Sequence, residues 1–415
     1  MDAQSRNRGR RPVSRAQRAA GQGWLTPFAP VFHRLLDRID RGLDAGGIDA
    51  TLPDGTHRML GGRADGPLPV VHVVRWRALV RLATGGSAGW YEAWAAGDWT
   101  SPDPVPLFDL FMRNRRSLGQ AARAKAWSKG LRRLRHWLRR NTPDRSRSNI
   151  AYHYDLGNDF YAPWLDASMT YSSALFPRDG MTLEDGQAAK LAAVLERTGT
   201  GPGDSILEIG CGWGSFAQAA VAGGRRVHGI TLSTEQRDYS HARVPAGAEF
   251  ILTDYRAVTG TYDAVASIEM VEAVGREYWP IYLSTIARVL KPGGRAAIQL
   301  ITIDDAIFES YASNVDFIQQ YVFPGGMLIA RDEFRGLADR AGLAWRDERA
   351  FGIDYADTLR MWRERFDAAW KAGRLPVEFD RDFIDLWRYY LMYCEGGFRG
   401  RGIDVLQVTL VKEGA

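Results

Sequence analysis

The second half of the chain alternates between short apolar runs and longer segments with helical spacing. The apolar runs lie at 204–209, 226–231, 248–252, 262–267, 295–301 and 406–412. Short strands that alternate with helices are typical of βαβ units. The pattern therefore predicts an α/β domain with a doubly wound, mostly parallel sheet.

The first half has a different pattern. Residues 1–23 are rich in Arg, Gln and Gly, and we predict a disordered basic tail there. Residues 24–112 predict a small N-terminal α+β domain. We expect strands at 70–74 and 78–82, and helices around 91–94 and over 104–112.

Residues 113–147 form a basic connector, with eleven arginines and two lysines against Asp144 alone. Its apolar residues recur at i, i+4, i+7 and i+11, which predicts a helix with a narrow apolar stripe. These residues are Trp127, Leu131, Leu134 and Leu138. Such a helix can dock on an anionic membrane surface or pack its stripe on its own domain. Nucleic acid is a weaker third alternative, because no recognised binding module accompanies the patch.

A long segment, 303–400, separates the last predicted strand from the others. It is helical in pattern and unusually rich in aromatic residues, including Phe308, Tyr321, Trp362 and Trp387. Core packing accounts for many of them. We interpret the excess as a helical lid or an apolar substrate tunnel inserted into the domain 148–415.

Composition indicates the cellular compartment of the protein. The chain has 415 residues, two cysteines and a formal net charge of +5 at pH 7. Two distant cysteines imply no disulfide framework and favour a reducing compartment. No apolar run is long enough to span a membrane, and the N-terminus lacks the apolar core of a secretory signal. We therefore expect a cytoplasmic protein.

The string Glu208-Ile-Gly-Cys-Gly-Trp-Gly214 follows the first predicted strand of the sheet. Gly210, Gly212 and Gly214 allow a tight turn and a close approach of the backbone to a ligand. The spacing is GxGxG rather than the GxGxxG of dinucleotide binders. It fits a cofactor with an amino-acid end and a nucleoside end, as in class I S-adenosylmethionine (SAM) methyltransferases, better than a pyrophosphate.

Polar residues follow the next strands at the edge where ligands bind in doubly wound folds. Glu208 ends the first strand, where a carboxylate can hold the amino group of methionine. Thr231 ends the second strand and Gln236 lies five residues later at the start of a helix. Both offer neutral hydrogen bonds to ribose and adenosine, with helix capping as the alternative. Asp254 and Tyr255 follow the third strand, where we expect adenine contacts. No metal site is predicted.

Several further motifs carry a family resemblance. They are Tyr152-His-Tyr-Asp-Leu-Gly-Asn-Asp-Phe-Tyr161, Met169-Thr-Tyr-Ser172, the EIGCGWG turn, Gly229-Ile-Thr-Leu-Ser233, Val271-Glu-Ala-Val-Gly275 and Phe351-Gly-Ile-Asp-Tyr355. In order and spacing they resemble the cyclopropane-fatty-acyl-phospholipid synthases over about residues 148–412. The resemblance implies a Rossmann-like methyltransferase sheet and SAM as cofactor. It also places Tyr171 and Ser172 at SAM-contacting positions.

The resemblance implies methyl transfer from SAM to the double bond of an unsaturated phospholipid acyl chain. The enzyme would then associate peripherally with the inner face of the cell membrane. Proteins of this family often self-associate, so a homodimer is one alternative. No periodicity in the sequence defines an interface for it. Aromatic faces such as Tyr171 and Tyr355 can stabilise the carbocation that methyl transfer leaves on the substrate.

In the family, bicarbonate is the base that removes a proton from this cation. The resemblance places its cage at Glu272, Tyr355 and the backbone near Ile301. Two cage positions differ, because Ser173 stands for a Cys and Gln299 for a His. Ser and Gln can hydrogen-bond an anion but do not titrate near neutral pH. Two alternatives follow: bicarbonate is held more weakly, or Glu272 is itself the base.

These departures leave three outcomes open: cyclopropane formation, methylation without ring closure, and loss of catalysis. Two other functions also compete with methylation of an acyl chain at carbon. One is small-molecule N-methylation, against which the aromatic insertion and the basic connector argue. The other is SAM binding without catalysis, against which the retention of Glu272 and Tyr355 argues.

Overall fold

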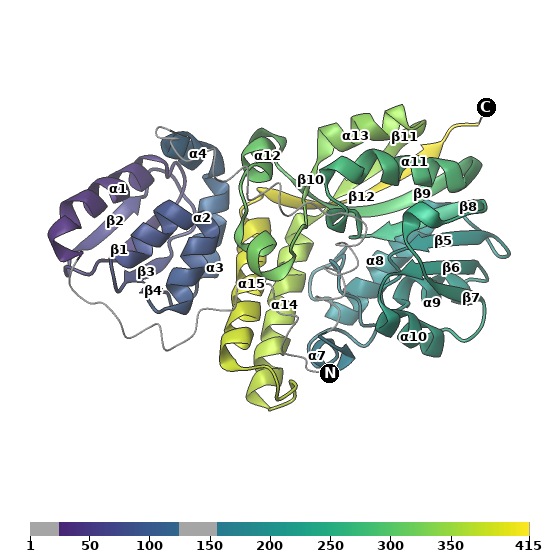
Figure 1. Cartoon of the computed structure of the whole chain (residues 1–415), viewed down its shortest axis with the longest axis horizontal. Helices are drawn as coiled ribbons and strands as arrows, with labels where there is room; N and C mark the ends of the chain where they lie inside the picture. The colour runs from purple at the N-terminus through teal and green to yellow at the C-terminus, as the bar shows by residue number, and fades with distance from the viewer. Residues whose placement is uncertain (1–24, 124–155, 415) are drawn as a thin grey trace. The chain divides into compact units, whose positions relative to one another are not determined.

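The computed structural model describes residues 25–123 and 156–414, which divide into two compact units (Figure 1). The described part of unit 1 consists of residues 25–123, 306–324 and 377–402. That of unit 2 consists of residues 156–305, 325–376 and 403–414. Unit 1 therefore combines the N-terminal segment with two pieces of the predicted helical insertion, 303–400. The rest of that insertion belongs to unit 2.

Unit 2 contains an eight-stranded sheet within the described residues, in the order β11-β12-β9-β8-β5-β6-β7, with β10 beside β9. Its strands are β5 (Ser205–Ile209), β6 (Arg226–Thr231), β7 (Ala248–Leu252), β8 (Tyr262–Ile268), β9 (Leu290–Ile303), β10 (Ile329–Ala330), β11 (Leu343–Ala350) and β12 (Ile403–Lys412). The run from β9 to β7 is parallel, whereas β12 and β11 pair antiparallel. The predicted doubly wound, mostly parallel fold is confirmed.

Both faces of this sheet are covered. Ile206 packs in a core cluster with Val194 and Phe216, and Leu207, which points to the opposite face, is equally buried. The helices of unit 2 are α7 (Asn158–Tyr161), α8 (Leu183–Thr198), α9 (Ser215–Ala222), α10 (Thr234–Arg243), α11 (Trp279–Val289), α13 (Arg331–Arg340) and α14 (Gly352–Lys371). Helices α8 and α9 pack together, as do α11 and α13.

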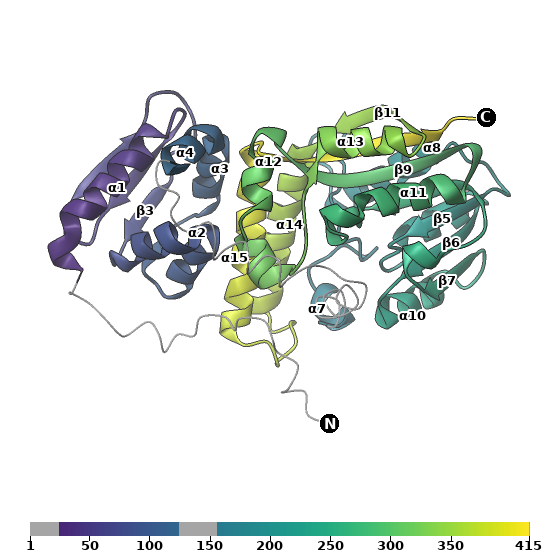
Figure 2. The same cartoon turned by 45° about the horizontal axis from the view of Figure 1, so that its top comes forward.

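Unit 1 is built on a four-stranded sheet in the order β2-β1-β3-β4. Its strands are β1 (Gly47–Thr51), β2 (His57–Gly61), β3 (Val70–Val73) and β4 (Trp99–Thr100). Its helices are α1 (Ala29–Arg41), α2 (Arg77–Ala95), α3 (Val105–Arg113), α4 (Arg115–Arg123), α12 (Asp305–Ala312), which starts one residue before the unit, and α15 (Arg381–Arg399). Helix α1 lies against β2 (Figure 1) and covers one face of this sheet (Figure 2).

Aromatic packing joins the distant segments of unit 1. The Tyr91 ring contacts Phe317 at 4.9 Å and Tyr389 at 5.0 Å between ring centroids. Helix α15 also approaches α3 closely, since a Cβ on Gly396 would lie 2.4 Å from the Cβ of Phe108. Many aromatic residues of the insertion therefore serve a packed core.

The prediction of a strand at 78–82 is wrong, because these residues lie in α2. The physical reason is the carboxylate of Asp98, which is fully buried. It accepts hydrogen bonds from Arg75 at 3.1 Å, from Arg77 at 2.9 Å and from Arg81 at 2.9 Å. Helical spacing places Arg77 and Arg81 on one face, where both can reach this carboxylate.

The predicted basic tail, 1–23, lies outside the described residues, and so does the connector beyond Arg123, including its whole apolar stripe. The start of the connector is helical as α4. Among the helices that the structure describes, none is long and apolar enough to cross a bilayer.

We expect Asp98→Asn to lower the free energy of unfolding by about 3–5 kcal/mol, because it removes the buried charge that pairs three arginines. Urea unfolding followed by tryptophan fluorescence measures the change. Asp37→Asn is the matched control, since Asp37 pairs with Arg58 at the surface and its side chain is 50% exposed. An Asp98 variant as stable as that control would contradict the role of this cluster.

Candidate active site

The site begins at the turn after β5, the central strand of the parallel sheet. Gly210 and Gly214 have φ of +82° and +81°, a region that favours glycine. The N–H groups of Gly210 and Cys211 donate to the carbonyl of Ile230 at 3.0 Å, which ties the turn to β6. A Cβ on Gly210 would lie 2.8 Å from the Met270 side chain. The turn backbone at Gly210 therefore lies so close to the loop after β8 that no side chain fits between them.

A cavity lies at this edge of the sheet, within unit 2. The space between its walls is about 1180 Å³, including a part open to solvent. Nine of the ten predicted cofactor-binding residues line it: Tyr171, Ser172, Glu208, Gly210, Gly212, Thr231, Gln236, Asp254 and Tyr255. Gly214 does not line it and instead is the N-cap of α9. The predicted cofactor residues therefore surround one cavity at the carboxyl ends of the parallel strands.

Glu208 brings an unpaired buried oxygen to this cavity. Its Oε2 has no hydrogen-bond partner among the described residues. Burial raises the pKa of Glu208 well above its ordinary value, and the charge of Lys190 opposes that rise. A carboxylate in this state gains most from a cationic donor, such as the ammonium group of SAM. The glycine turn and this oxygen together fit the methionine end of the cofactor.

Lys190 is a buried cation that the sequence patterns did not reveal. It lies on α8, lines the cavity and donates to Ser172 Oγ at 2.7 Å. Burial lowers the pKa of Lys190 to about 8, while the carboxylates of Glu269, Asp166 and Glu208 act to raise it. Lys190 therefore supplies positive charge among buried carboxylates.

Thr231 at the end of β6 and Gln236 at the start of α10 have a structural role as well as a place in the cavity wall. Thr231 Oγ1 donates to Gln236 Oε1 at 2.8 Å and accepts from the backbone of Ser233 at 3.1 Å. The N-cap of α10 is Ser233, whose side chain accepts from the Gln236 N–H. Thr231 and Gln236 thus hold the strand-to-helix turn and face the cavity together.

Asp254 and Arg256, which follow β7, form an ion pair beside two aromatic rings. Asp254 accepts from Arg256 Nε at 2.8 Å and Nη2 at 2.5 Å. The Arg256 guanidinium lies 5.5 Å from the ring centroid of Tyr255 and 5.4 Å from that of Tyr278. Burial raises the pKa of Tyr255, and its hydroxyl has no partner among the described residues. This end of the cavity offers flat rings and a free hydroxyl to an adenine base.

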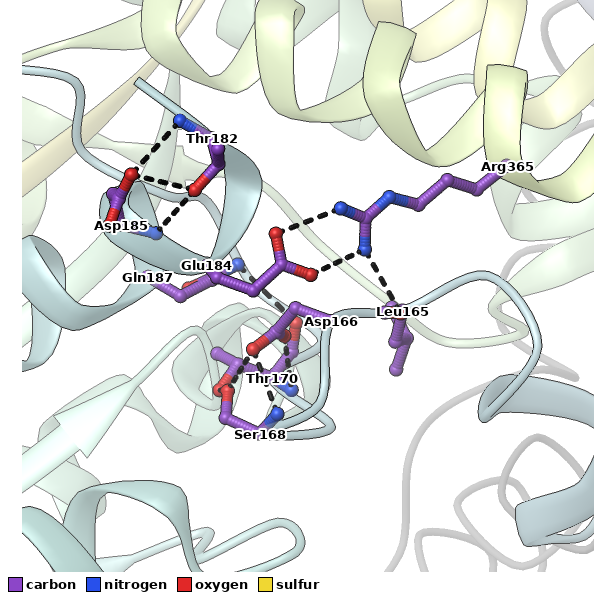
Figure 3. Close-up of polar contacts among 9 residues, drawn as sticks. All are labelled: Leu165, Asp166, Ser168, Thr170, Thr182, Glu184, Asp185, Gln187 and Arg365. Atoms are coloured by element: carbon purple, nitrogen blue, oxygen red, sulfur yellow. Dashed lines mark hydrogen bonds and ion pairs between the residues drawn. The ribbon is translucent and has the colours of Figure 1, made fainter.

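A polar network around Asp166 and Thr170 holds the loop that leads to residues 171–173 (Figure 3). Asp166 accepts from the backbone of Ser168 at 2.9 Å and of Thr170 at 3.1 Å. Gln187 on α8 donates to the carbonyl of Ser172 at 2.9 Å.

Arg365 on α14 extends this network to Glu184 on α8, with two hydrogen bonds of 2.9 Å (Figure 3). It also donates to the carbonyl of Leu165 at 3.4 Å. Two helices therefore fix the start of the loop beside the cavity.

Three predicted catalytic residues converge on a carboxylate that the sequence patterns did not reveal, Glu269. Its Oε1 accepts from the Ser173 N–H at 2.9 Å and from Gln299 Nε2 at 2.8 Å. Its Oε2 accepts from the Tyr355 hydroxyl at 2.7 Å. Glu269 directly follows β8 and lines the cavity. The available signal was its place at the carboxyl end of a central strand.

The remaining two predicted catalytic residues form a separate pair. Glu272 Oε1 accepts from the backbone N–H of Ile301, while its Oε2 is buried with no partner among the described residues. Burial, followed by the charge of Glu269, raises the pKa of Glu272 to about 8. Because of this raised pKa, Glu272 is mostly a neutral acid at neutral pH. Its side chain does not line the cavity.

Aromatic rings lie beside this carboxylate cluster. The Tyr171 ring is 5.3 Å from Trp362 and 5.7 Å from Trp164 between centroids. Trp362 in turn lies 6.1 Å from Tyr355 at a nearly perpendicular angle. The rings can exclude water and offer their faces to a cation.

The doubly wound sheet and its cavity are those of a class I SAM-dependent methyltransferase. The family model described as mycolic acid cyclopropane synthetase matches residues 141–408. The chain belongs to this family.

The sequence is 36% identical to the tuberculostearic acid methyltransferase UfaA1 of Mycobacterium tuberculosis, over 93% of this chain and 92% of that protein. It is 35% identical to the cyclopropane-fatty-acyl-phospholipid synthase of Escherichia coli, over 62% of this chain and 66% of that protein. The crystal structure of mycolic acid cyclopropane synthase CmaA1 complexed with SAH and CTAB aligns with a TM-score of 0.61 at 30% identity, covering 64% of this chain and 98% of that one. The protein is therefore a SAM-dependent methyltransferase related to enzymes of lipid modification.

We expect Glu208→Gln to weaken SAM binding about 10- to 100-fold, since a hydrogen bond to a charged group contributes about 1.5–3 kcal/mol. The melting temperature of the free protein should hold or rise, because its buried, unpaired carboxylate is gone. Isothermal titration calorimetry and thermal unfolding give the two values. Glu196→Gln, at an exposed site on α8, is the control. Unchanged affinity would remove Glu208 from the cofactor site.

Proposed function

We propose that this enzyme transfers a methyl group from SAM to the double bond of an unsaturated fatty acyl chain of a phospholipid. The observation that supports this most is the placement of Glu269. It lines the cavity and is held by Ser173, Gln299 and Tyr355 beside aromatic rings. An alkene acceptor needs a base and cation-stabilising surfaces of this kind.

Bound SAM supplies an electrophilic methyl group on its sulfonium sulfur. Glu208 would hold its amino group, the turn at Gly210 and Gly212 its amino-acid backbone, and Asp254 and Tyr255 its adenine. The methylated substrate bears positive charge on a carbon, which the faces of Tyr171 and Tyr355 would stabilise by about 0.5–2 kcal/mol per contact. The same rings would keep water from the cation.

The product depends on which proton then leaves. Loss from the new methyl group closes a cyclopropane ring, whereas loss from another carbon of the substrate gives a methylated product that keeps a double bond. The relative that aligns over nearly the whole sequence is named a methyltransferase, and the E. coli relative a cyclopropane synthase. Both outcomes add one methylene unit to the acyl group.

The proposed substrate belongs to a membrane, so we also propose a cytoplasmic protein that docks on anionic lipid through residues 113–147. The support is the charge of this segment, which has thirteen basic side chains against one acidic side chain. Each basic residue near an anionic surface contributes about 1 kcal/mol.

The first test incubates the purified protein with SAM and vesicles of monounsaturated phospholipid. Mass spectrometry of the fatty acids should show an acyl group heavier by one methylene unit. Double-bond derivatisation then separates the products, since a cyclopropane resists it and a methylated alkene reacts. Absence of any heavier acyl group would overturn the proposed acceptor.

Replacing Arg132, Arg133, Arg139 and Arg140 by Gln should weaken binding to anionic vesicles at least tenfold, because four charges leave the surface. High salt should weaken binding of the unmodified protein in the same direction. Vesicle co-sedimentation measures both effects, with neutral phosphatidylcholine vesicles as control. Equal sedimentation of both proteins would refute docking through this segment.

A further inference from the structure

The cage predicted for bicarbonate does not fit a bound anion in this protein. Its donors are the Ser173 N–H, the Gln299 amide, the Tyr355 hydroxyl and the Ile301 N–H. The first three donate to Glu269, and the fourth donates to Glu272. The Ser173 hydroxyl donates to the carbonyl of Ala174 at 2.8 Å. A bicarbonate would thus lose its donors and meet the negative charge of Glu269 at close range.

We propose that the Glu269 carboxylate takes the place of bicarbonate and is the catalytic base that removes the proton from the methylated acyl group. This assignment rests on the proposed function. It adds a catalytic residue and removes the need for an external anion.

The position of Glu269 suits this step. Its Oε1 carries two donors, whereas its Oε2 is bonded to Tyr355 and, as a carboxylate oxygen, retains a lone pair for a proton. The side chain lines the cavity, unlike that of Glu272. Glu269 therefore borders the cavity proposed for SAM, where the methyl group would be delivered.

The surroundings also suit a base. Burial raises the pKa of Glu269 above its ordinary value, while Tyr355, Ser173 and Gln299 act against the rise through hydrogen bonds and Lys190 through its charge. The result is a carboxylate more basic than one in water, surrounded by donors that favour its charged form. Glu272, with a pKa of about 8, keeps its proton at neutral pH and adds little competing negative charge.

The reaction balances with these groups alone. The π electrons of the alkene form the new bond to the methyl carbon, and the bond from that carbon to sulfur breaks with its electron pair left on S-adenosylhomocysteine. The other alkene carbon becomes cationic. Glu269 Oε2 then accepts a proton, and the freed C–H electron pair either closes the ring or forms a new double bond. Glu269 is left as a neutral acid and returns its proton to water when the product leaves.

The backbone of Glu269 adopts a conformation that is unfavourable for a residue with a side chain. Its φ is +48°, one of four positive values at non-glycine residues among those described. The Glu269 N–H is bonded to the Gln299 carbonyl at 2.8 Å, which fixes this conformation. A glycine here would adopt the same φ without strain and would vacate the space of the carboxylate.

Three proteins test the proposal in the acyl-group assay: the unmodified enzyme, Glu269→Gln and Glu269→Gly. Each is assayed in buffer stripped of carbon dioxide and in buffer with added bicarbonate. The unmodified enzyme should turn over equally in both. Glu269→Gln should lose at least 100-fold in turnover in both, the lower range for general-base catalysis. Glu269→Gly should be equally impaired without bicarbonate and regain activity when bicarbonate is added.

Glu249→Gln, an exposed change on β7, is the control, and calorimetry with S-adenosylhomocysteine should give affinities within twofold for all variants. Loss of activity of the unmodified enzyme on removal of bicarbonate, or full turnover by Glu269→Gln, would overturn the assignment and leave the proposed function standing. Absence of product from the unmodified enzyme would overturn the proposed function and the assignment with it.

Discussion

The parallel pairing of β5 with β6 on one side and β8 on the other organises unit 2. All three strands end at the same edge, and their connections leave toward different helices, which opens a crevice at that edge. The glycine turn after β5, the polar turn after β6 and the carboxylate after β8 meet there because of this topology. Neighbouring strands can therefore share one site although their residues are far apart in the sequence.

Local patterns predicted the sheet well where strands are buried. The expected ends of β5, β6, β7 and β8 agree with the structure to within one residue, because short apolar runs between turns have few alternatives. Strand β11 was missed because five of its eight residues are exposed at the sheet edge and half of its residues are charged. The region 78–82 has the composition of a strand, but long-range bonds to Asp98 favour a helix.

Most residues of the cavity wall were predictable because they lie at the ends of strands, whereas Tyr171 and Ser172 were placed there by the family resemblance alone. Glu269 was harder to identify, since its partners come from three distant segments that carry Ser173, Gln299 and Tyr355. The family resemblance assigns these three residues to the cage of a bound bicarbonate. No periodicity in the sequence reveals that a side chain of the protein fills the position of that anion. Lys190 was missed for a similar reason, because a lysine on a helix ordinarily points to solvent.

The positive φ of Glu269 has a consequence for how such enzymes diverge. Glycine is the residue best suited to this backbone, and each glutamate codon differs from a glycine codon by a single base. One point mutation therefore separates a site with room for a dissolved anion from a site with a base built into the protein. The surrounding donors serve either state without changing themselves. In this protein the source of basicity thus depends on a single codon position.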